Sequence, residues 1–278
     1  MGKDPVKIAS LQHVYSSLQL VQKYIRYYLH GANSKGHGIH SPFVFDFVLH
    51  VLNNKSGYFP LSCIHSLRER MKKDMEMLSI EDHGAGSRVA NSKSRTVSKL
   101  AKTAVKPAKY GEMFYRLVRH YQPQLIVELG TSLGITTSYL ASAQPNGQVI
   151  TIEGSKAIHE RASKNFEELS MRNIKALHGN FDHVLPEVLK ELPYVDLAYI
   201  DGNHRYEPTL HYFHQLLAKV SNHSILVFDD IHWSTEMEQA WHYIKQHKRV
   251  TATIDVFFLG FVFFRNEFKS QQHFTIRF

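Results

Sequence analysis

The stretch LIVELGTSLGITTSYLASA, residues 125–143, decides the fold. Its first five residues form an apolar run typical of a buried strand, and residues 135–143 read as a helix. Gly130 and Gly134 lie between the two and let the backbone turn tightly and approach a ligand closely. A helix that begins directly after such a turn offers unpaired backbone N–H groups to that ligand. The stretch therefore predicts a strand–turn–helix unit that holds a nucleotide-like cofactor.

The residues that follow repeat this alternation of strand and helix. Further strands are expected at residues 148–154, 174–179, 195–202 and 224–230, with a helix after each. Strands separated by helices imply right-handed crossovers and a parallel, doubly wound α/β sheet. Residues 250–266 read instead as two strands joined near Gly260, and residues 272–278 as a candidate for a short last strand. Such a hairpin adds antiparallel pairing at one edge of a mostly parallel sheet.

The upstream residues carry mainly helical signals. Residues 18–29 are one helical stretch, and Ser41-Pro42 begins another with a serine cap and a proline in the first turn. A third helix is indicated by apolar residues at helical spacing: Ile64, Leu67, Met71, Met75 and Leu78. We therefore expect a helical N-terminal extension over residues 1–109 and one α/β domain over residues 110–278.

Composition and charge narrow the class of protein. The chain has 278 residues and a formal net charge of +8. Residues 1–125 hold 19 Lys and Arg against 8 Asp and Glu, whereas residues 126–278 hold 14 against 17. This asymmetry favours an anionic partner near the N-terminal part, although a solvated basic face explains it equally well. No signal sequence, no membrane-length apolar run and a single cysteine, Cys63, lead us to expect a cytoplasmic protein.

A second glycine-rich stretch, IEDHGAGSRVA at residues 80–90, competes for the role of cofactor loop. We expect no strand before it, because MEMLSI reads as the end of a helix, and no strand that ends in an acid after it. The loop at residues 130–134 has both, since Glu153 ends the next predicted strand and suits the hydroxyl groups of a ribose. Its G-x-x-x-G spacing differs from the G-x-G-x-x-G of nicotinamide and flavin dinucleotide sites. The later loop is therefore the predicted cofactor loop.

These motifs together resemble the class I S-adenosylmethionine-dependent methyltransferases. VELGTSLG is similar to their first motif and TIEGS to their ribose-binding acid, and the late hairpin matches their strand order. The resemblance covers residues 110–278 and implies a Rossmann-like methyltransferase fold with seven strands. YIDGNHRYE and VFDDIHW narrow it to small-molecule O-methyltransferases of the catechol and macrolide-sugar types. KGHGIHSPFVFDF resembles an extension on some uncharacterised bacterial members, and a homodimer is implied at family level.

The resemblance also implies which residues bind S-adenosylmethionine. The methionine part would be surrounded by Glu128, Gly130, Thr131, Ser132 and Gly134. The ribose would be held by Glu153, and the adenine would lie beside Asn180, Phe181 and Asp182. Phe181 is also interpretable as an ordinary loop aromatic.

Three aspartates follow two neighbouring strands and indicate the chemical site. Asp201 follows one strand and Asp229-Asp230 the next, so their carboxylates can converge and hold a magnesium ion that activates the acceptor oxygen. In the alternative, Asp201 caps a helix or binds the amine of the cofactor. His204 stands where the catechol-type enzymes carry a lysine base, and with Asp201 it is the predicted catalytic residue. It could equally be a pocket residue that orients the substrate.

Basic residues recur every three or four positions just before the domain: Arg95, Lys99, Lys102, Lys106 and Lys109. This spacing predicts one basic face of an amphipathic helix over residues 94–106, closed by Pro107. We interpret the helix as a lid over an anionic acceptor, with HGAGSR as its flexible link and His37 and His40 as further lid residues. A solvated helical face is the alternative.

The predicted function is magnesium-assisted O-methylation of a small phenolic or anionic hydroxyl compound. An RNA methyltransferase is the main alternative, because basic charge and this fold often occur together. I-D-G-N at residues 200–203, in place of an N-P-P-[YF]-type stretch, argues against it but leaves it open. A cofactor-binding protein without catalysis and an aminopropyl transferase are the remaining alternatives.

Overall fold

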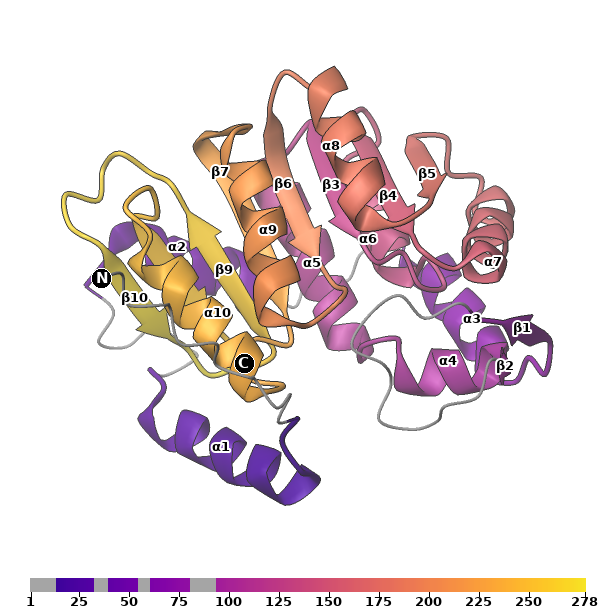
Figure 1. Cartoon of the computed structure of the whole chain (residues 1–278), viewed down its shortest axis with the longest axis horizontal. Coiled ribbons are helices and arrows are strands. Elements are labelled where there is room, and N and C mark those ends of the chain that lie inside the picture. The colour runs from indigo at the N-terminus through magenta and orange to yellow at the C-terminus, as the bar shows by residue number, and fades with distance from the viewer. Residues whose placement is uncertain (1–13, 33–39, 55–60, 81–93) are drawn as a thin grey trace, which may run out of the picture.

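The computed structural model describes residues 14–32, 40–54, 61–80 and 94–278 (Figure 1). The predicted fold class is confirmed, because a mostly parallel sheet is flanked by helices and preceded by a helical region. Its strands are β3 (Leu125–Leu129), β4 (Gln148–Glu153), β5 (Ile174–His178), β6 (Val195–Ile200), β7 (Val220–Asp229), β8 (Ala252–Asp255), β9 (Leu259–Phe263) and β10 (Gln272–Thr275). They lie in the order β10-β8-β9-β7-β6-β3-β4-β5.

The strand order places a crevice beside β3. Strand β3 is hydrogen-bonded in parallel to both β4 and β6, so the chain moves outward in one direction after β3 and in the other after β5. Ligands of open α/β sheets bind at such a reversal, outside the carboxyl ends of the strands. The predicted late hairpin is β8–β9, and β9 is antiparallel to both β7 and β8. The expected join near Gly260 is wrong, because the turn lies at residues 256–258 and Gly260 is inside β9. The edge strand β10, parallel to β8, makes the sheet eight-stranded rather than seven-stranded.

Helices cover both faces of the sheet, which explains why its strands read as continuous apolar runs. One face carries α5 (Ala108–Tyr121), α6 (Ile135–Ala143) and α7 (Lys156–Glu168), and the other carries α8 (Phe181–Glu191), α9 (Tyr206–Leu217) and α10 (Thr235–Gln246) (Figure 1). Neighbouring residues of β3 face opposite cores: Ile126 packs with the α5–α6 side and Val127 with the α8–α9 side. Strands buried on both faces contain few polar positions.

The N-terminal region packs around this domain as separate short elements. They are α1 (Ser17–His30), α2 (Pro42–Phe47), the π-helix η1 (Val48–Leu52), α3 (Leu61–Met71) and α4 (Val97–Thr103). The predicted cap of α2 is confirmed, because the Ser41 side chain accepts a hydrogen bond from Val44 N. Helix α1 is tied to the domain by an ion pair of 2.9 Å between Lys23 and Glu238.

Two expectations for this region are wrong. Helix α3 ends at Met71, Met75 is exposed, and Leu78 lies in a short strand, β1 (Met77–Ser79). MEMLSI therefore does not end a helix. Its strand pairs antiparallel with β2 (Ser94–Thr96), a partner far along the chain that local apolar spacing does not reveal. Residues 81–93, which include the competing glycine-rich loop, lie outside the described residues, as does His37.

The predicted basic helical face is also wrong. Helix α4 contains Lys99 and Lys102, whereas Arg95 lies in β2 and Lys109 in α5. Lys106 lies between the two helices, directly before Pro107. The residue before a proline is disfavoured in helical conformation, so the helix ends and Lys106 turns to a different environment.

Candidate active site

A cavity of about 930 Å³ lies at the carboxyl ends of the central strands. One side is lined by residues of the loops after β3, β4 and β6, such as Ser132, Glu153 and Asn203. The opposite side is lined by residues that precede the domain, from α1 and from positions 95–110. Its volume suits a site that holds a cofactor and a small second substrate together.

The loop after β3 takes a conformation that requires glycine. Gly130 has φ +97°, and a Cβ atom there would lie 1.9 Å from the backbone oxygen of Asp201. Gly134 has φ +78°, and its Cβ would meet the ring of Phe166 at 2.5 Å. The two glycines therefore let the loop run against β6 and let α6 begin against α7. Gly130 and Ser132 line the cavity.

Glu153 sits beside this loop at the end of β4. Its two carboxylate oxygens accept one backbone N–H each, from Ser132 at 2.9 Å and from Ser155 at 3.0 Å. Burial raises the pKa of Glu153, while the N–H groups of Ser155, Ser132 and Gly154 oppose the rise. A carboxylate held in this way keeps free lone pairs on the cavity side, which fits a ribose diol.

Glu128 and Thr131 support the loop from behind rather than line the cavity. Glu128 is fully buried, and its Oε2 accepts hydrogen bonds from Thr137 and Thr151. Thr131 Oγ1 bonds Thr151 Oγ1 at 2.6 Å, which extends the same chain. Burial raises the pKa of Glu128 to about 8, against the effect of the two threonines. Among the described residues, Glu128 Oε1 has no hydrogen-bond partner, which leaves it available to the amine of a bound cofactor.

The residues predicted beside the adenine lie together at the start of α8. Asn180 caps this helix by accepting a hydrogen bond from Asp182 N at 2.8 Å. Asn180 and Phe181 line the cavity, and the Phe181 ring packs edge-on against Tyr212 at 6.0 Å. Asp182 lies outside the lining and accepts a hydrogen bond from Tyr212 at 2.9 Å. The predicted binding residues that line the cavity offer the chemistry to hold S-adenosylmethionine: Gly130, Ser132, Glu153, Asn180, Phe181 and Asp201. The others do not line it: Glu128, Thr131, Gly134 and Asp182.

Asp201, Asp229 and Asp230 also line the cavity, with Asp201 directly beside Gly130, and Lys106 reaches Asp229 and Asp230. Lys106 Nζ lies 2.9 Å from Asp229 Oδ1 and 3.1 Å from Asp230 Oδ1. The Lys106 side chain is 18% exposed, and Asp229 is almost completely buried. Burial lowers the pKa of Lys106, but the charges of Asp229, Asp230 and Asp201 raise it by more than burial lowers it. The ammonium therefore stays charged. Sequence reasoning missed this contact and assigned Lys106 to the surface of a lid.

The buried aspartates titrate as a coupled pair. Burial raises the pKa of Asp229 well above its usual range, and the charge of Asp201 raises it further, against Lys106. Burial acts in the same direction on Asp201, but hydrogen bonds with His204 and Asp229 lower its pKa to about 2. Tyr199 adds a hydrogen bond of 2.9 Å to Asp201 Oδ2. The charge of Asp201 therefore favours a proton on Asp229, and the Lys106 ammonium beside Asp229 opposes this.

His204 lies next to this pair. Its Nε2 is 3.5 Å from Asp201 Oδ1, and both residues line the cavity. Burial lowers the pKa of His204, but the hydrogen bond with Asp201 and the charge of Asp230 outweigh it and raise the pKa above 6.5. His204, Asn203, Asp230 and Ser132 all have φ between 34° and 65°, in the left-handed region. Strained backbone of this kind concentrates at functional sites.

The described side chains do not fit the predicted magnesium ion. Among the described residues, the group of three or more metal-type side chains whose ligand atoms all lie within 4.8 Å of one another is Asp46, His50 and His120. The three aspartates do not meet this condition, and the Lys106 ammonium already neutralises two of them. A single lysine thus takes the place expected for the metal.

Helix α1 contributes to the wall, which the sequence did not suggest. Leu20, Val21 and Tyr24 line the cavity, and the Tyr24 ring packs edge-on against Phe257 at 5.0 Å. The only sequence signal was the helical period of residues 18–29, which says nothing about what the helix covers. In the part of the chain that the structure describes, no helix is long and apolar enough to cross a bilayer.

The chain is similar to known proteins in two ways: part of it matches a family model, and its fold resembles solved structures. Residues 127–231 match the family model of a methyltransferase domain. The SAH-bound Podospora anserina methyltransferase PaMTH1 is 13% identical, with a TM-score of 0.59, over 81% of this chain and 97% of that one. The O-methyltransferase TomG of Streptomyces achromogenes, solved with SAM and involved in tomaymycin synthesis, is 18% identical over 59% and 83%, with a TM-score of 0.52. An SAH-bound O-methyltransferase of Bacillus cereus is 18% identical over 80% and 97%, with a TM-score of 0.52.

The fold and the site define a class I methyltransferase architecture with its cofactor loop after the first strand of the domain. Within it, residues 127–231 carry the match to the family model of a methyltransferase domain. The predicted resemblance to the S-adenosylmethionine-dependent class, and with it the expectation of a methyltransferase enzyme, is therefore confirmed.

Proposed function

We propose that the protein transfers the methyl group of S-adenosylmethionine to a hydroxyl oxygen of a small phenolic or anionic acceptor. One observation carries this proposal. One cavity is lined both by Glu153 and the glycine loop and by Lys106, Asp201 and His204. The first group suits a nucleoside and the second suits an oxygen that loses a proton. The solved O-methyltransferases with this fold support the choice of oxygen as the acceptor atom.

Glu153 holds the ribose in this proposal, and the backbone of Gly130 and Ser132 approaches the methionine part. When bound, S-adenosylmethionine supplies an electrophilic methyl group. The cavity then holds the acceptor oxygen in line with that group, and such positioning supplies much of the rate in displacement reactions. Walls from α1 and residues 95–110 keep water away from the reacting atoms.

His204 is the proposed general base. In its neutral form, Nε2–H faces the carboxylate of Asp201, so the free Nδ1 accepts the proton of the acceptor hydroxyl and Asp201 stabilises the imidazolium that results. Lys106 stabilises negative charge on the acceptor oxygen, in the role that the sequence suggested for magnesium. The magnesium-assisted version of this reaction is therefore replaced by a metal-independent one.

The basic wall suits an anionic acceptor. Arg95, Lys102, Lys106 and Lys109 all line the cavity, although they do not share one helical face. Lys102 is exposed at the surface of α4 and free to meet a ligand from solvent. A charge-reversed pair, Lys99→Glu with Lys102→Glu, should raise the KM of an anionic acceptor steeply and leave that of a neutral phenol nearly unchanged.

A binding assay and a methyl transfer assay on the purified protein distinguish this proposal from the alternatives. We would titrate S-adenosylhomocysteine into the full chain by calorimetry, with Glu153→Ala as the test variant and Glu160→Ala, on the exposed face of α7, as control. Binding that Glu153→Ala abolishes and Glu160→Ala retains is expected. Methyl transfer to catechols, phenols and anionic hydroxyl compounds then tests the reaction.

Each rival predicts a different result in these assays. Salt-sensitive oligonucleotide binding with methyl transfer only to RNA would indicate the RNA methyltransferase. Preference for a decarboxylated cofactor would indicate an aminopropyl transferase. Binding without turnover on any acceptor would indicate a protein that senses the cofactor.

We also propose a homodimer, on the evidence of an apolar stripe on α1. Leu18, Val21, Ile25 and Leu29 recur at helical spacing and are each at least half exposed. A second copy of the chain would cover such a face. Light scattering of the purified protein measures the mass directly, and a monomer with the mass of one chain would refute this proposal.

A further inference from the structure

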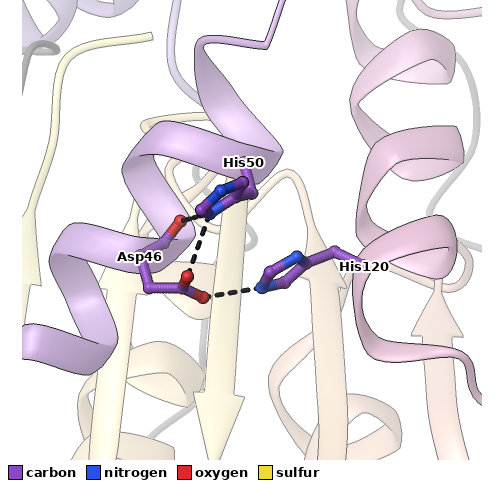
Figure 2. A group of neighbouring side chains, drawn as sticks. All are labelled: Asp46, His50 and His120. Carbon is purple, nitrogen blue, oxygen red and sulfur yellow. Dashed lines mark hydrogen bonds and ion pairs between the residues drawn. The ribbon is translucent and has the colours of Figure 1, made fainter.

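A second group of titratable side chains lies outside the cavity, where α2 and η1 pack against α5. Figure 2 shows the Asp46 carboxylate beside the two rings, within reach of a nitrogen of both His50 and His120. The Asp46 carboxylate is 2.9 Å from His50 Nδ1 and 2.6 Å from His120 Nε2. The two imidazole rings are stacked nearly parallel, 5° apart, with centroids separated by 4.8 Å. None of the three residues lines the cavity.

The backbone that carries these side chains is fixed by other contacts. Arg116, one helical turn before His120, donates a hydrogen bond of 2.7 Å to Val51 O. Phe47 is fully buried and packs edge-on against Phe261 at 5.0 Å. The interface between η1 and α5 therefore does not depend on the three polar side chains, which hold their positions in advance of any ligand.

The helix itself is irregular at this position. Residues Val48–Leu52 form a π-helix, in which Asn53 N donates to Val48 O at 3.0 Å. Single π-helical turns are uncommon inside helices and occur frequently at functional sites. Here the turn carries His50 four positions after Asp46, so that both side chains face α5 (Figure 2).

The donor set is that of a transition metal. One carboxylate oxygen and two imidazole nitrogens, all within 4.8 Å of one another, are ligands that zinc prefers, whereas magnesium and calcium prefer oxygen alone. Ligand atoms around a tetrahedral zinc lie about 3.3 Å apart, given bond lengths of about 2.0 Å. The distances of 2.6 and 2.9 Å are those of hydrogen bonds, so the carboxylate and the two nitrogens separate by a few tenths of an ångström when zinc binds. His50 Nδ1 also gives up its contact with Asp46 O, and the two parallel rings rotate so that both nitrogens face the ion.

The exposure of the cluster suits an ion that enters from solvent. The side chains of Asp46, His50 and His120 are 41%, 50% and 27% exposed. Three protein ligands leave a fourth position on the ion for water.

We propose that Asp46, His50 and His120 bind a zinc ion that fastens the N-terminal region to the methyltransferase domain. The ion joins α2 and η1 to the last turn of α5, which leads directly into β3. This site is independent of the proposed reaction, because it shares no residue with the cavity. Zinc binding would thus persist in variants that lack cofactor binding.

The test uses the full chain, stripped with a chelator and then titrated with zinc chloride by calorimetry. One equivalent of zinc should bind tightly, and His50→Ala or His120→Ala should weaken that binding by roughly 100-fold or more, since even losing a partner of a ligand costs 10–100-fold. His30→Ala is the matched control. His30 also bonds a backbone oxygen four residues earlier, at 2.8 Å to Arg26 O, as His50 does to Asp46 O at 3.0 Å.

Two further measurements keep the test decisive if an alanine variant folds poorly. Asp46→Asn and His120→Gln preserve the size and hydrogen bonding of the side chains, and each should still lose the tight equivalent. Cobalt in place of zinc should give the visible absorption of a tetrahedral site in the wild type and in His30→Ala only. Zinc affinity equal in all variants, or no tight equivalent in the wild type, would overturn the proposal and leave a hydrogen-bonded network.

Discussion

Replacing Lys106 with methionine removes the ammonium from beside Asp229 and Asp230 while keeping a side chain of similar length. The aspartates then share a buried site without their cation. Removing one partner of a buried ion pair costs about 3–5 kcal/mol, and the 18% exposure of Lys106 places the cost near the lower end, at about 3 kcal/mol at pH 7.

The pH dependence of this loss has a definite sign. Without Lys106, the pKa values of the neighbouring carboxyl groups rise in the folded state, so the folded protein takes up a proton as the pH falls. Each unit of such a rise is worth about 1.4 kcal/mol, and the uptake relieves the repulsion. The variant should therefore be about 3 kcal/mol less stable than the wild type at pH 7 and only about 1–2 kcal/mol less stable at pH 5.

Urea unfolding at the two pH values measures the stability, and a methyl transfer assay with and without EDTA measures the role in the reaction. Lys102→Met, on the exposed surface of α4, is the control and should change the stability little. Lys106→Met should lose about 100-fold or more in kcat/KM, the usual effect of removing a group that stabilises a developing negative charge. A stability loss that does not change with pH, or a wild-type activity abolished by EDTA and restored by magnesium, would refute the assignment of Lys106.

Three further predictions concern single residues. Gly130→Ala should abolish binding of S-adenosylhomocysteine, because the new methyl group meets the backbone of Asp201 at 1.9 Å; calorimetry measures this, and retained affinity would contradict it. The kcat/KM of the wild type should rise with pH through a pKa above 6.5 as His204 loses its proton, and His204→Gln should flatten that profile. Burial lowers the pKa of His232, but hydrogen bonds with Asp255 and Glu238 outweigh it and raise the pKa to about 9. His232 therefore contributes stability that is complete below about pH 6.5 and lost as the pH rises through 9. Urea unfolding should show a loss of about 2–3 kcal/mol over this range that His232→Gln lacks.

The central domain could be predicted from sequence because its determinants are local. A strand buried on both faces is an apolar run of a few residues, and LIVEL corresponds to β3 residue for residue. The carboxyl ends of parallel strands meet at one edge, so residues that end separate strands, such as Glu153 and Asp201, could be placed around one site without any knowledge of packing.

The acceptor side could not be predicted because its contacts join distant segments. The basic spacing around Lys99 and Lys106 matched a helical period, but the proline after Lys106 ended the helix and the ion pair with Asp230 formed instead. The same limit applies to β1, whose partner β2 lies beyond residues 81–93. An ion pair between a loop and a strand end leaves no periodic trace in a sequence.

The contacts on the two sides of the cavity also differ in the sequence separation of the residues that make them. On the cofactor side, Ser132 and Glu153 are 21 positions apart. On the acceptor side, Lys106 and Asp230 are separated by 124 positions. Closing a loop of 124 residues rather than 21 costs about 1.6 kcal/mol more in chain entropy, and contacts of high sequence separation form slowly. During refolding, the ability to bind S-adenosylhomocysteine should therefore return before the ability to transfer a methyl group.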